Sequence, residues 1–437
     1  LTRQSDRCRT SRMTSDHRPH DEHANTNVSV ASLPANFWRH FAASVSSNLG
    51  DGMVAAAAPL LALSLTNDSR LIAAVSAAAM LPWLVLSLPA GVIIDRHERR
   101  NILTASNGVR AALFGILALS IVFDLITIWL LLVIVLFLAV GEVFFDMAAQ
   151  AFLPSIVDES LLERANGRLY AAEVAANSFV GLPVGAWLFV VAAAAPFGLQ
   201  ATALLVAAAL ITSIRLPQHA WPAHGNHDAM PQRSLTTEMR EGLRWLWAHP
   251  FLRLLALMLG AANMCHMFAQ SIFAKFVRDE LDLGPRGFGL LLSASAIGSI
   301  VGGLVGSRIA WKLGAATAIV GAYVMFAALE ILPGAVPQVW AVVVAGVLMS
   351  VSGTVWNVLT VSARQRLIPS ELFGRVNSVY RFIGTGTSAL GAIIGGQIAF
   401  HFGLRATYLV SGATLSIVLA LGAPRLLTLS KRYASTN

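Results

Sequence analysis

Long apolar runs separated by short polar turns fill the chain from about residue 37 onward. Each run has the roughly 20 residues that a helix needs to cross the hydrocarbon core of a bilayer. A polar stretch at 216–249 divides the runs into two equal sets, so the pattern predicts an all-α integral membrane protein with twelve transmembrane helices in two six-helix bundles. The expected spans lie at about 37–65, 71–94, 101–123, 127–150, 162–191, 195–215, 251–277, 287–310, 314–334, 337–362, 371–400 and 404–427.

The polar segments complete the expected domain plan. The N-terminal segment is rich in Arg, His, Asp and Asn and lacks the apolar run of a signal peptide, so we expect a disordered cytoplasmic tail there. The chain begins with Leu1, and we expect the natural start elsewhere, with Met13 as a candidate. The stretch between the bundles predicts a linker with a short amphipathic helix near 235–248. The expected domains are a tail at 1–35, a bundle at 36–215, the linker at 216–249, a second bundle at 250–428 and a cytoplasmic tail at 429–437.

The two halves repeat each other in sequence. Arg164 and Asn166, at the start of the fifth span, recur 211 residues further along as Arg375 and Asn377. Paired halves around a midplane site are a recurring plan of secondary transporters. At about the same spacing, Gly181 falls near Gly391 and Gly185 falls on Gly396.

Composition and charge placement support a membrane protein. Of the 437 residues, 56% are hydrophobic and 12% are charged, whereas a soluble protein is about 25% charged. The net charge of +8 would suit a nucleic-acid partner, but most of the 31 lysines and arginines fall on one side when the N-terminus is inside. The charge therefore reflects topology. We expect a multi-pass protein of the inner (plasma) membrane with both termini cytoplasmic, and no nucleic-acid partner.

A short loop between the second and third spans carries the sharpest motif. A glycine allows helices to approach closely, and an acid at a helix end can pair with a basic residue or cap a facing helix. We expect the motif to be a gating loop. It resembles the signature of the major facilitator superfamily, G-x-x-x-D-R-x-x-R-R/K. Its residues are Gly91, Asp95, Arg96, Arg99 and Arg100, and Ser307 replaces Asp95 in the second-half copy, so a charged latch is expected only in the first half.

Further segments resemble the enterobactin exporter and macrolide efflux branch of that superfamily. They are Asn48-Leu-Gly-Asp51-Gly-Met, Leu81-Pro-Trp-Leu and Gly141-Glu142-x-Phe-Phe-Asp146. The resemblance implies twelve helices, alternating access and export of a small molecule, commonly against a proton gradient. Gly181-Leu-Pro183-Val-Gly185 is similar, imperfectly, to the fifth-helix motif of drug/proton antiporters, although a close helix crossing explains it equally well.

Charged residues inside the spans indicate a structural or functional role, because inserting each one into the membrane costs about 2.5–3.5 kcal/mol on insertion scales. Glu142, Asp146 and Gln150 are spaced by four and share one helix face. A carboxylate in a cavity can bind and release a proton during a transport cycle. For Arg110 we favour the alternative, a fixed pair with a carboxylate that holds the first bundle together. The candidates for proton coupling or transport are Asp51, Arg110, Glu142, Asp146, Glu173 and Arg381.

Polar residues also line up in the second half. The acid Asp51 corresponds there to Asn263, so we expect ion coupling in the first half, where the acids concentrate. Such polar residues either line a cavity or bond neighbouring helices. The cavity candidates are Asn48, Gln150, Asn263, His266, Gln270, Trp356 and Asn357.

Missing motifs narrow the function. No Walker loop or catalytic constellation is present in the sequence, and His266 has no partner at metal-ligand spacing, so we expect no enzyme activity, no cofactor and no metal. The favoured hypothesis is a monomeric, proton-coupled exporter (an antiporter) of a small molecule such as a siderophore or a drug. An uptake carrier of the same fold and a non-transporting membrane receptor or regulator remain alternatives.

Overall fold

The computed structural model describes residues 33–214 and 235–434, and in these residues the regular elements are all helices. Within this described part, twelve helical spans are long and apolar enough to cross a membrane, which confirms the predicted fold class. The predicted 1–35 tail and 216–249 linker fall mostly outside the described residues. The N-terminal half contains α1 (Ala35–Leu65), α2 (Ser69–Arg96), α3 (Arg99–Val122), α4 (Ile128–Phe152), α5 (Leu162–Val174), the π-helix η3 (Ala175–Gly181), α6 (Leu182–Val191) and α7 (Ala195–Thr212).

The C-terminal half has the same number of spans and one additional helix. Its first span, the seventh of the chain, is broken at Ser271–Ile272, and its last helix continues to Ala434, past the predicted bundle end at residue 428. The elements are α8 (Leu235–Ala248), α9 (Pro250–Gln270), α10 (Phe273–Asp279), α11 (Pro285–Leu313), α12 (Ala315–Ala335), α13 (Val339–Leu367), α14 (Ser370–Phe402) and α15 (Leu404–Ala434).

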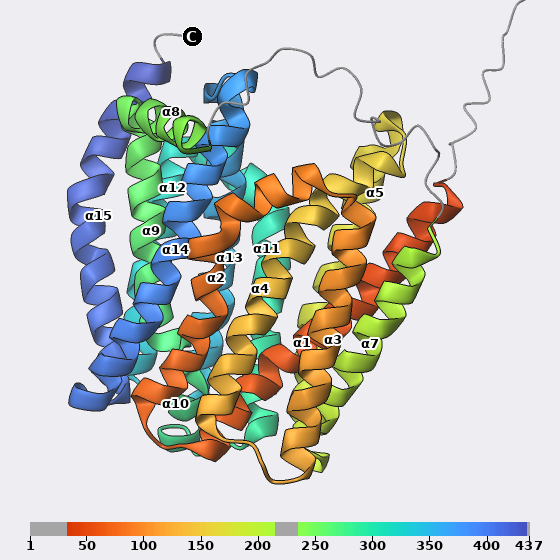
Figure 1. Ribbon diagram of the computed structural model, residues 1–437. Helices are drawn as coiled ribbons and strands as arrows, with labels where there is room; N and C mark the ends of the chain where they lie inside the picture. The colour runs from red at the N-terminus through yellow and green to blue at the C-terminus, as the bar shows by residue number, and fades with distance from the viewer. Residues whose placement is uncertain (1–32, 215–234, 435–437) are drawn as a thin grey trace, which may run out of the picture. The chain divides into compact units, whose positions relative to one another are not determined.

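Each half is a bundle, and the two bundles meet along two helix pairs (Figure 1). Within the first bundle α1 and α3 pack on α7, and α2 packs on α4. Within the second, α9 packs on α14, α11 on α13 and α12 on α15. Between the bundles α2 packs on α14, and α6 packs on α11. A site between these pairs would be bordered by both halves.

In the part of the chain that the structure describes, the two bundles share a hydrophobic core at one end only. We call the end that carries α8 the linker end. At the opposite end, one cluster combines Leu60 and Ile72 of the first half with Phe276 and Tyr408 of the second. Among the described residues, the cluster nearest the linker end in the first half contains no second-half residue, and the main second-half cluster contains no first-half residue. The bundles are therefore joined by apolar packing away from the linker.

The fifth span changes helix type in its middle. It runs as α5, the π-helix η3 and α6, and a π-turn accommodates one extra residue in an α-helix. Gly181 and Gly185 approach the backbone of α1, and Gly391 and Gly395 approach the backbone of α9 in the same way. These pairs are 210 residues apart, whereas Arg164 and Arg375 are 211 apart. The extra residue of the π-helix accounts for the difference.

One predicted pairing in the repeat is therefore wrong by a single residue. Gly396, which the sequence aligns with Gly185, faces α2 of the other half, where an added Cβ would lie 2.7 Å from the Cβ of Ala73. Gly395 takes the place equivalent to Gly185 in the contact with its own bundle.

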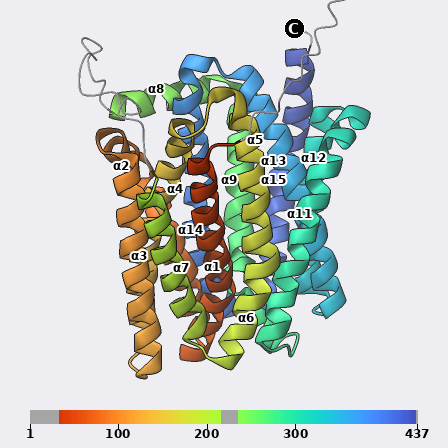
Figure 2. The same cartoon turned by 90° about the vertical axis from the view of Figure 1, so that its right-hand side faces the viewer.

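The predicted amphipathic helix is confirmed as α8, which lies across the ends of the spans in both views (Figures 1 and 2). An ion pair of 2.7 Å joins Glu241 of α8 to Arg375 at the start of α14. Gly242 lies against the backbone of Arg375, where a Cβ would be 2.7 Å from the carbonyl oxygen. This contact links α8 to one of the two helix pairs between the bundles.

Candidate functional site

A buried hydrogen-bonded ion pair lies inside the first bundle. The Arg110 guanidinium on α3 is only 3% exposed, and its Nη2 donates to Asp51 Oδ1 on α1 at 2.7 Å. The same oxygen accepts from Gln200 Nε2 on α7 at 2.7 Å, while Ser47 Oγ donates to Oδ2 at 3.3 Å. Three helices are thus joined through one carboxylate. Sequence reasoning anticipated an Arg110–carboxylate pair but missed Gln200.

Two glycines make this network possible. A Cβ on Gly141 of α4 would lie 2.8 Å from Arg110 Cγ, and a Cβ on Gly50 would overlap the Gln200 side-chain amide. Gly141 is therefore needed for packing, because any larger residue there would displace Arg110. The residue that follows it, Glu142, carries a charge.

Three further carboxylates gather around this pair. Glu142 and Asp146 of α4 lie close enough to Arg110 for their charges to act on it, and Glu173 of α5 acts on Asp146. Neither acid of α4 nor Glu173 forms a direct ion pair with another described side chain, whereas Asp51 does. We call Asp51, Glu142, Asp146 and Glu173 the acidic cluster. The side chains of Gln150 and Arg381, also predicted here, lie outside the described part of the structure.

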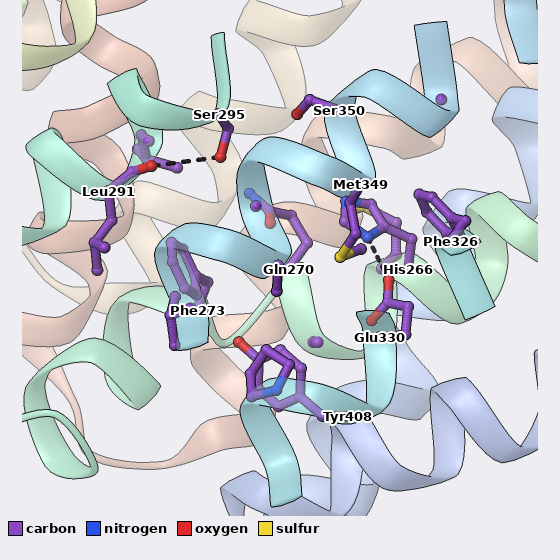
Figure 3. Close-up of a pocket in the computed structure, with 18 of the residues that line it drawn as sticks. His266, Gln270, Phe273, Leu291, Ser295, Phe326, Glu330, Met349, Ser350 and Tyr408 are labelled. Carbon is purple, nitrogen blue, oxygen red and sulfur yellow. Dashed lines mark hydrogen bonds and ion pairs between the residues drawn. The ribbon is translucent and has the colours of Figure 1, made fainter. Parts of the chain in front are cut away.

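A second polar site lies in the C-terminal half (Figure 3). His266 Nδ1 of α9 is 2.6 Å from Glu330 Oε1 of α12, and both residues line a cavity of about 550 Å³. Gln270 lines the same cavity, which extends to Tyr408 of α15. We call it the C-terminal cavity. The structure thus places the predicted residues His266 and Gln270 together.

Glu330 adds a buried acid in the second half to the acids predicted from the sequence in the first. Its side chain is 1% exposed within the ninth span, so the second bundle also contains a buried acid. The signal was present in the sequence, because Glu330 is the only acidic residue between Asp282 and Glu371. Aligning the acids of the first half onto the second half does not reveal Glu330, because that alignment leads to other positions such as Asn263.

A smaller cavity of about 330 Å³ adjoins the first and shares Phe326 and Gly353 with it. Asn263, Trp356 and Asn357 line it, so three more predicted residues lie together. Asn263 Nδ2 donates to the Gly384 carbonyl at 2.8 Å. By contrast, Asn48 donates to the Ser44 carbonyl of its own helix at 2.9 Å.

The predicted gating loop is described in part. Arg99 begins α3, and Arg100 Nη1 donates at 3.1 Å to the carbonyl of Ile214, which follows the end of α7. The Nε of Arg100 also lies 3.1 Å from Glu98 Oε1. The side chains of Asp95 and Arg96 and the surroundings of Gly91 lie outside the described part of the structure.

Comparisons with known proteins bear out the resemblance inferred from the motifs. The sequence profile of a family described as transmembrane secretion effectors matches residues 29–434. The chain is 24% identical to macrolide efflux protein A of Streptococcus pyogenes, over 82% of this chain and 88% of that protein. It is 28% identical to multidrug efflux pump Tap of Mycolicibacterium fortuitum, over 88% of this chain and 94% of that protein. The crystal structure of the nucleoside transporter NupG shares the fold, with a TM-score of 0.72, 10% identity and coverage of 88% and 98% of the two chains.

Proposed function

The chain belongs to the transmembrane secretion effector family of the major facilitator superfamily, and from this premise we propose that it exports a drug-like small molecule in exchange for protons. The family and the relatives are transporters rather than enzymes. In this proposal the protein acts as a monomer in the inner membrane, with both termini and the linker end in the cytoplasm.

The acidic cluster carries the proposal. Asp51, Glu142 and Asp146 lie near a single buried arginine, and Glu173 lies near Asp51 and Asp146. Among the described side chains, that arginine forms a direct ion pair with Asp51 alone. A carboxylate inside a membrane protein without a fixed counter-ion is costly to keep charged, which is the property required of a group that binds and releases protons. Glu142 and Asp146 are the strongest candidates, while Asp51 has a structural partner in Arg110.

The packing of the bundles supports alternating access. The shared core lies opposite the linker end, so the described conformation is joined on the side that we assign to the exterior. An exporter must collect its cargo from the cytoplasmic side, and a conformation held together at the exterior is the one suited to that step.

The names of the relatives favour a drug over a siderophore as the cargo. Macrolide efflux and multidrug efflux describe the two proteins reported above. Each covers most of this chain, so the likeness includes both bundles rather than one motif.

Proton coupling predicts that cargo movement drives proton movement. In inside-out vesicles that have established a proton gradient and contain a pH dye, adding a transported drug should release protons from the lumen. Asp146→Asn and Glu142→Gln remove a titratable group while keeping its shape. Each should reduce this signal by at least about tenfold, because positioned proton-transfer groups typically contribute about 10²–10⁴-fold.

The matched control is Asp282→Asn, the same acid-to-amide change in a connecting segment distant from the acidic cluster. Asp282 has φ +53°, a conformation that Asn tolerates, so the control should fold and transport normally. Transport that is unchanged in both cluster variants would exclude coupling through this cluster. Drug accumulation in the opposite direction would indicate the alternative uptake carrier, and absence of movement for every drug and siderophore tested would indicate a receptor.

A further inference from the structure

We propose that the C-terminal cavity binds an organic cation with an aromatic or alkyl body, and that this cation competes with a proton at the His266–Glu330 pair. The inference rests on the proposed export function and adds to it a binding site and a substrate class. It also assigns a role to a buried acid that the acidic cluster of the first bundle does not involve.

The charge of the pair is the first reason. A carboxylate as buried as Glu330 must be compensated by a hydrogen bond or an opposite charge. His266 Nδ1, at 2.6 Å, provides the hydrogen bond. When the imidazole is neutral and donates from Nδ1, the pair has one net negative charge, and when the imidazole binds a second proton the pair is neutral. The negative charge of the pair can therefore be neutralised either by a proton on His266 or by a bound cation.

Access to the cavity is the second reason. Glu330 is covered, but the His266 side chain is 40% exposed and lies at the cavity wall. A ligand in the cavity would contact the imidazole and experience the carboxylate charge behind it through little intervening water. Such a short path through a medium of low dielectric constant keeps the attraction strong.

The walls suit a cation with a large apolar body. The ring centroids of Phe326 and His266 are 5.6 Å apart, and Phe273 and Tyr408 line the cavity from other helices (Figure 3). Aromatic faces attract cations in addition to providing apolar surface. A volume of about 550 Å³ falls within the usual range of 300–1,000 Å³ for small-molecule sites.

The adjoining smaller cavity contributes an independent observation. Trp356 is 7% exposed, and its indole N–H has no hydrogen-bond partner among the described residues. The Trp356 side chain lines the smaller cavity, which continues into the larger one past Phe326 and Gly353. A ligand that extends through both cavities would contact the indole ring, and a small rotation of the ring would let the N–H donate to an ether, carbonyl or hydroxyl oxygen of that ligand.

Few other titratable groups face the pair. Cys265 of α9 and Tyr408 of α15 experience the charge of Glu330. The cavity-lining residues of α11 and α13 include no ionisable side chain among the described residues. The pH dependence of cation binding is therefore expected to follow protonation of the His266 imidazole.

Two probes of nearly the same shape separate charge from shape. Methyltriphenylphosphonium carries a permanent positive charge, and triphenylphosphine oxide has the same three rings without net charge. Binding is measured at equilibrium on the full chain in lipid nanodiscs, so no transport is required. In alkaline buffer the wild type should bind the cation at least about tenfold more tightly than the oxide, and the preference should shrink as the buffer is acidified and His266 is protonated.

Three variants locate the site. Glu330→Gln should abolish the charge preference. His266→Gln keeps a hydrogen-bond donor for Glu330 and should make cation binding independent of pH. An added Cβ at Gly353 meets no atom within 4 Å, so Gly353→Leu should fold normally, project into both cavities and weaken both probes by about tenfold or more. Asp282→Asn should bind like the wild type.

The results distinguish this inference from the proposed function. A charge preference that survives Glu330→Gln, or binding unchanged by Gly353→Leu, would overturn the inference, and so would equal affinities of the wild type for the two probes. A preference lost in Asp146→Asn instead would place the cation in the acidic cluster. Drug-driven proton release could persist in all of these cases, and its absence would contradict the proposed function without affecting the binding result.

Discussion

At the scale of single residues, Arg110 is held by a chain of specific contacts. Its charge is removed from solvent, the Gly141 position leaves room for its methylene groups, and Asp51 supplies the balancing charge. Gln200 contacts the same Asp51 oxygen from a third helix. Because each member depends on the others, the loss of one should cost more than a typical surface contact.

We therefore expect Asp51→Ala to reduce the free energy of unfolding by about 3 kcal/mol, because it leaves a buried arginine without its partner. The double variant Asp51→Ala, Arg110→Met removes both charges and should recover most of this loss. Denaturant unfolding followed by tryptophan fluorescence measures both effects. A double variant no more stable than Asp51→Ala would show that the pair does not stabilise the bundle in this way.

At the scale of elements, glycines determine which helix faces can touch. An added Cβ on Gly185 would overlap the backbone of Met53, so α6 and α1 approach as closely as two backbones can. Gly115 of α3, in contrast, has no atom within 4 Å of its added Cβ. The same substitution should therefore have opposite effects at the two positions.

Gly185→Ala is expected to destabilise the protein by about 1–3 kcal/mol, because the backbones must separate to fit a methyl group. Gly115→Ala should be neutral or stabilising by up to about 1 kcal/mol, because alanine loses less backbone entropy in a helix. Melting temperatures of the two purified variants test the pair. Equal shifts would contradict the close crossing between α1 and α6.

At the scale of the whole molecule, polar contacts reinforce the joined end. Arg278 of α10 donates to Asn67 Oδ1 at 2.8 Å, and the Arg70 guanidinium lies 3.8 Å above the Phe400 ring of α14. Hydrogen bonds from Arg70 hold the pKa of Asp68 below its usual value and orient the arginine. Opening this end requires these contacts and the shared apolar core to separate together.

The sequence predicted the twelve spans, the two halves and α8 because hydropathy and periodicity are local properties. It also identified Asp51 and Arg110 as charges that need a partner. It could not identify Gln200 as that third partner, since its contact with Asp51 depends on how α7 packs. The π-helix was equally hidden, because its single extra residue is visible only when contacts show that Gly395, rather than Gly396, matches Gly185.

The central claim is alternating access. As cargo and protons bind, the two bundles separate at the end where they are joined and close together at the linker end. This claim is tested most directly by distances between spin labels in the full chain, with its two cysteines replaced by serine. One pair, at Tyr170 of α5 and Gln365 of α13, reports on the linker end, and a second, at Trp129 of α4 and Val339 of α13, reports on the opposite end. All four side chains are exposed, so labels should not disturb the packing.

When the pH is lowered or a transported drug is added, alternating access predicts that the two distances change in opposite directions. The linker-end pair should approach as the opposite pair separates. Asp146→Asn should remove the response to pH while Asp282→Asn keeps it. Distances that stay constant under every condition, or that lengthen together at both ends, would contradict the claim.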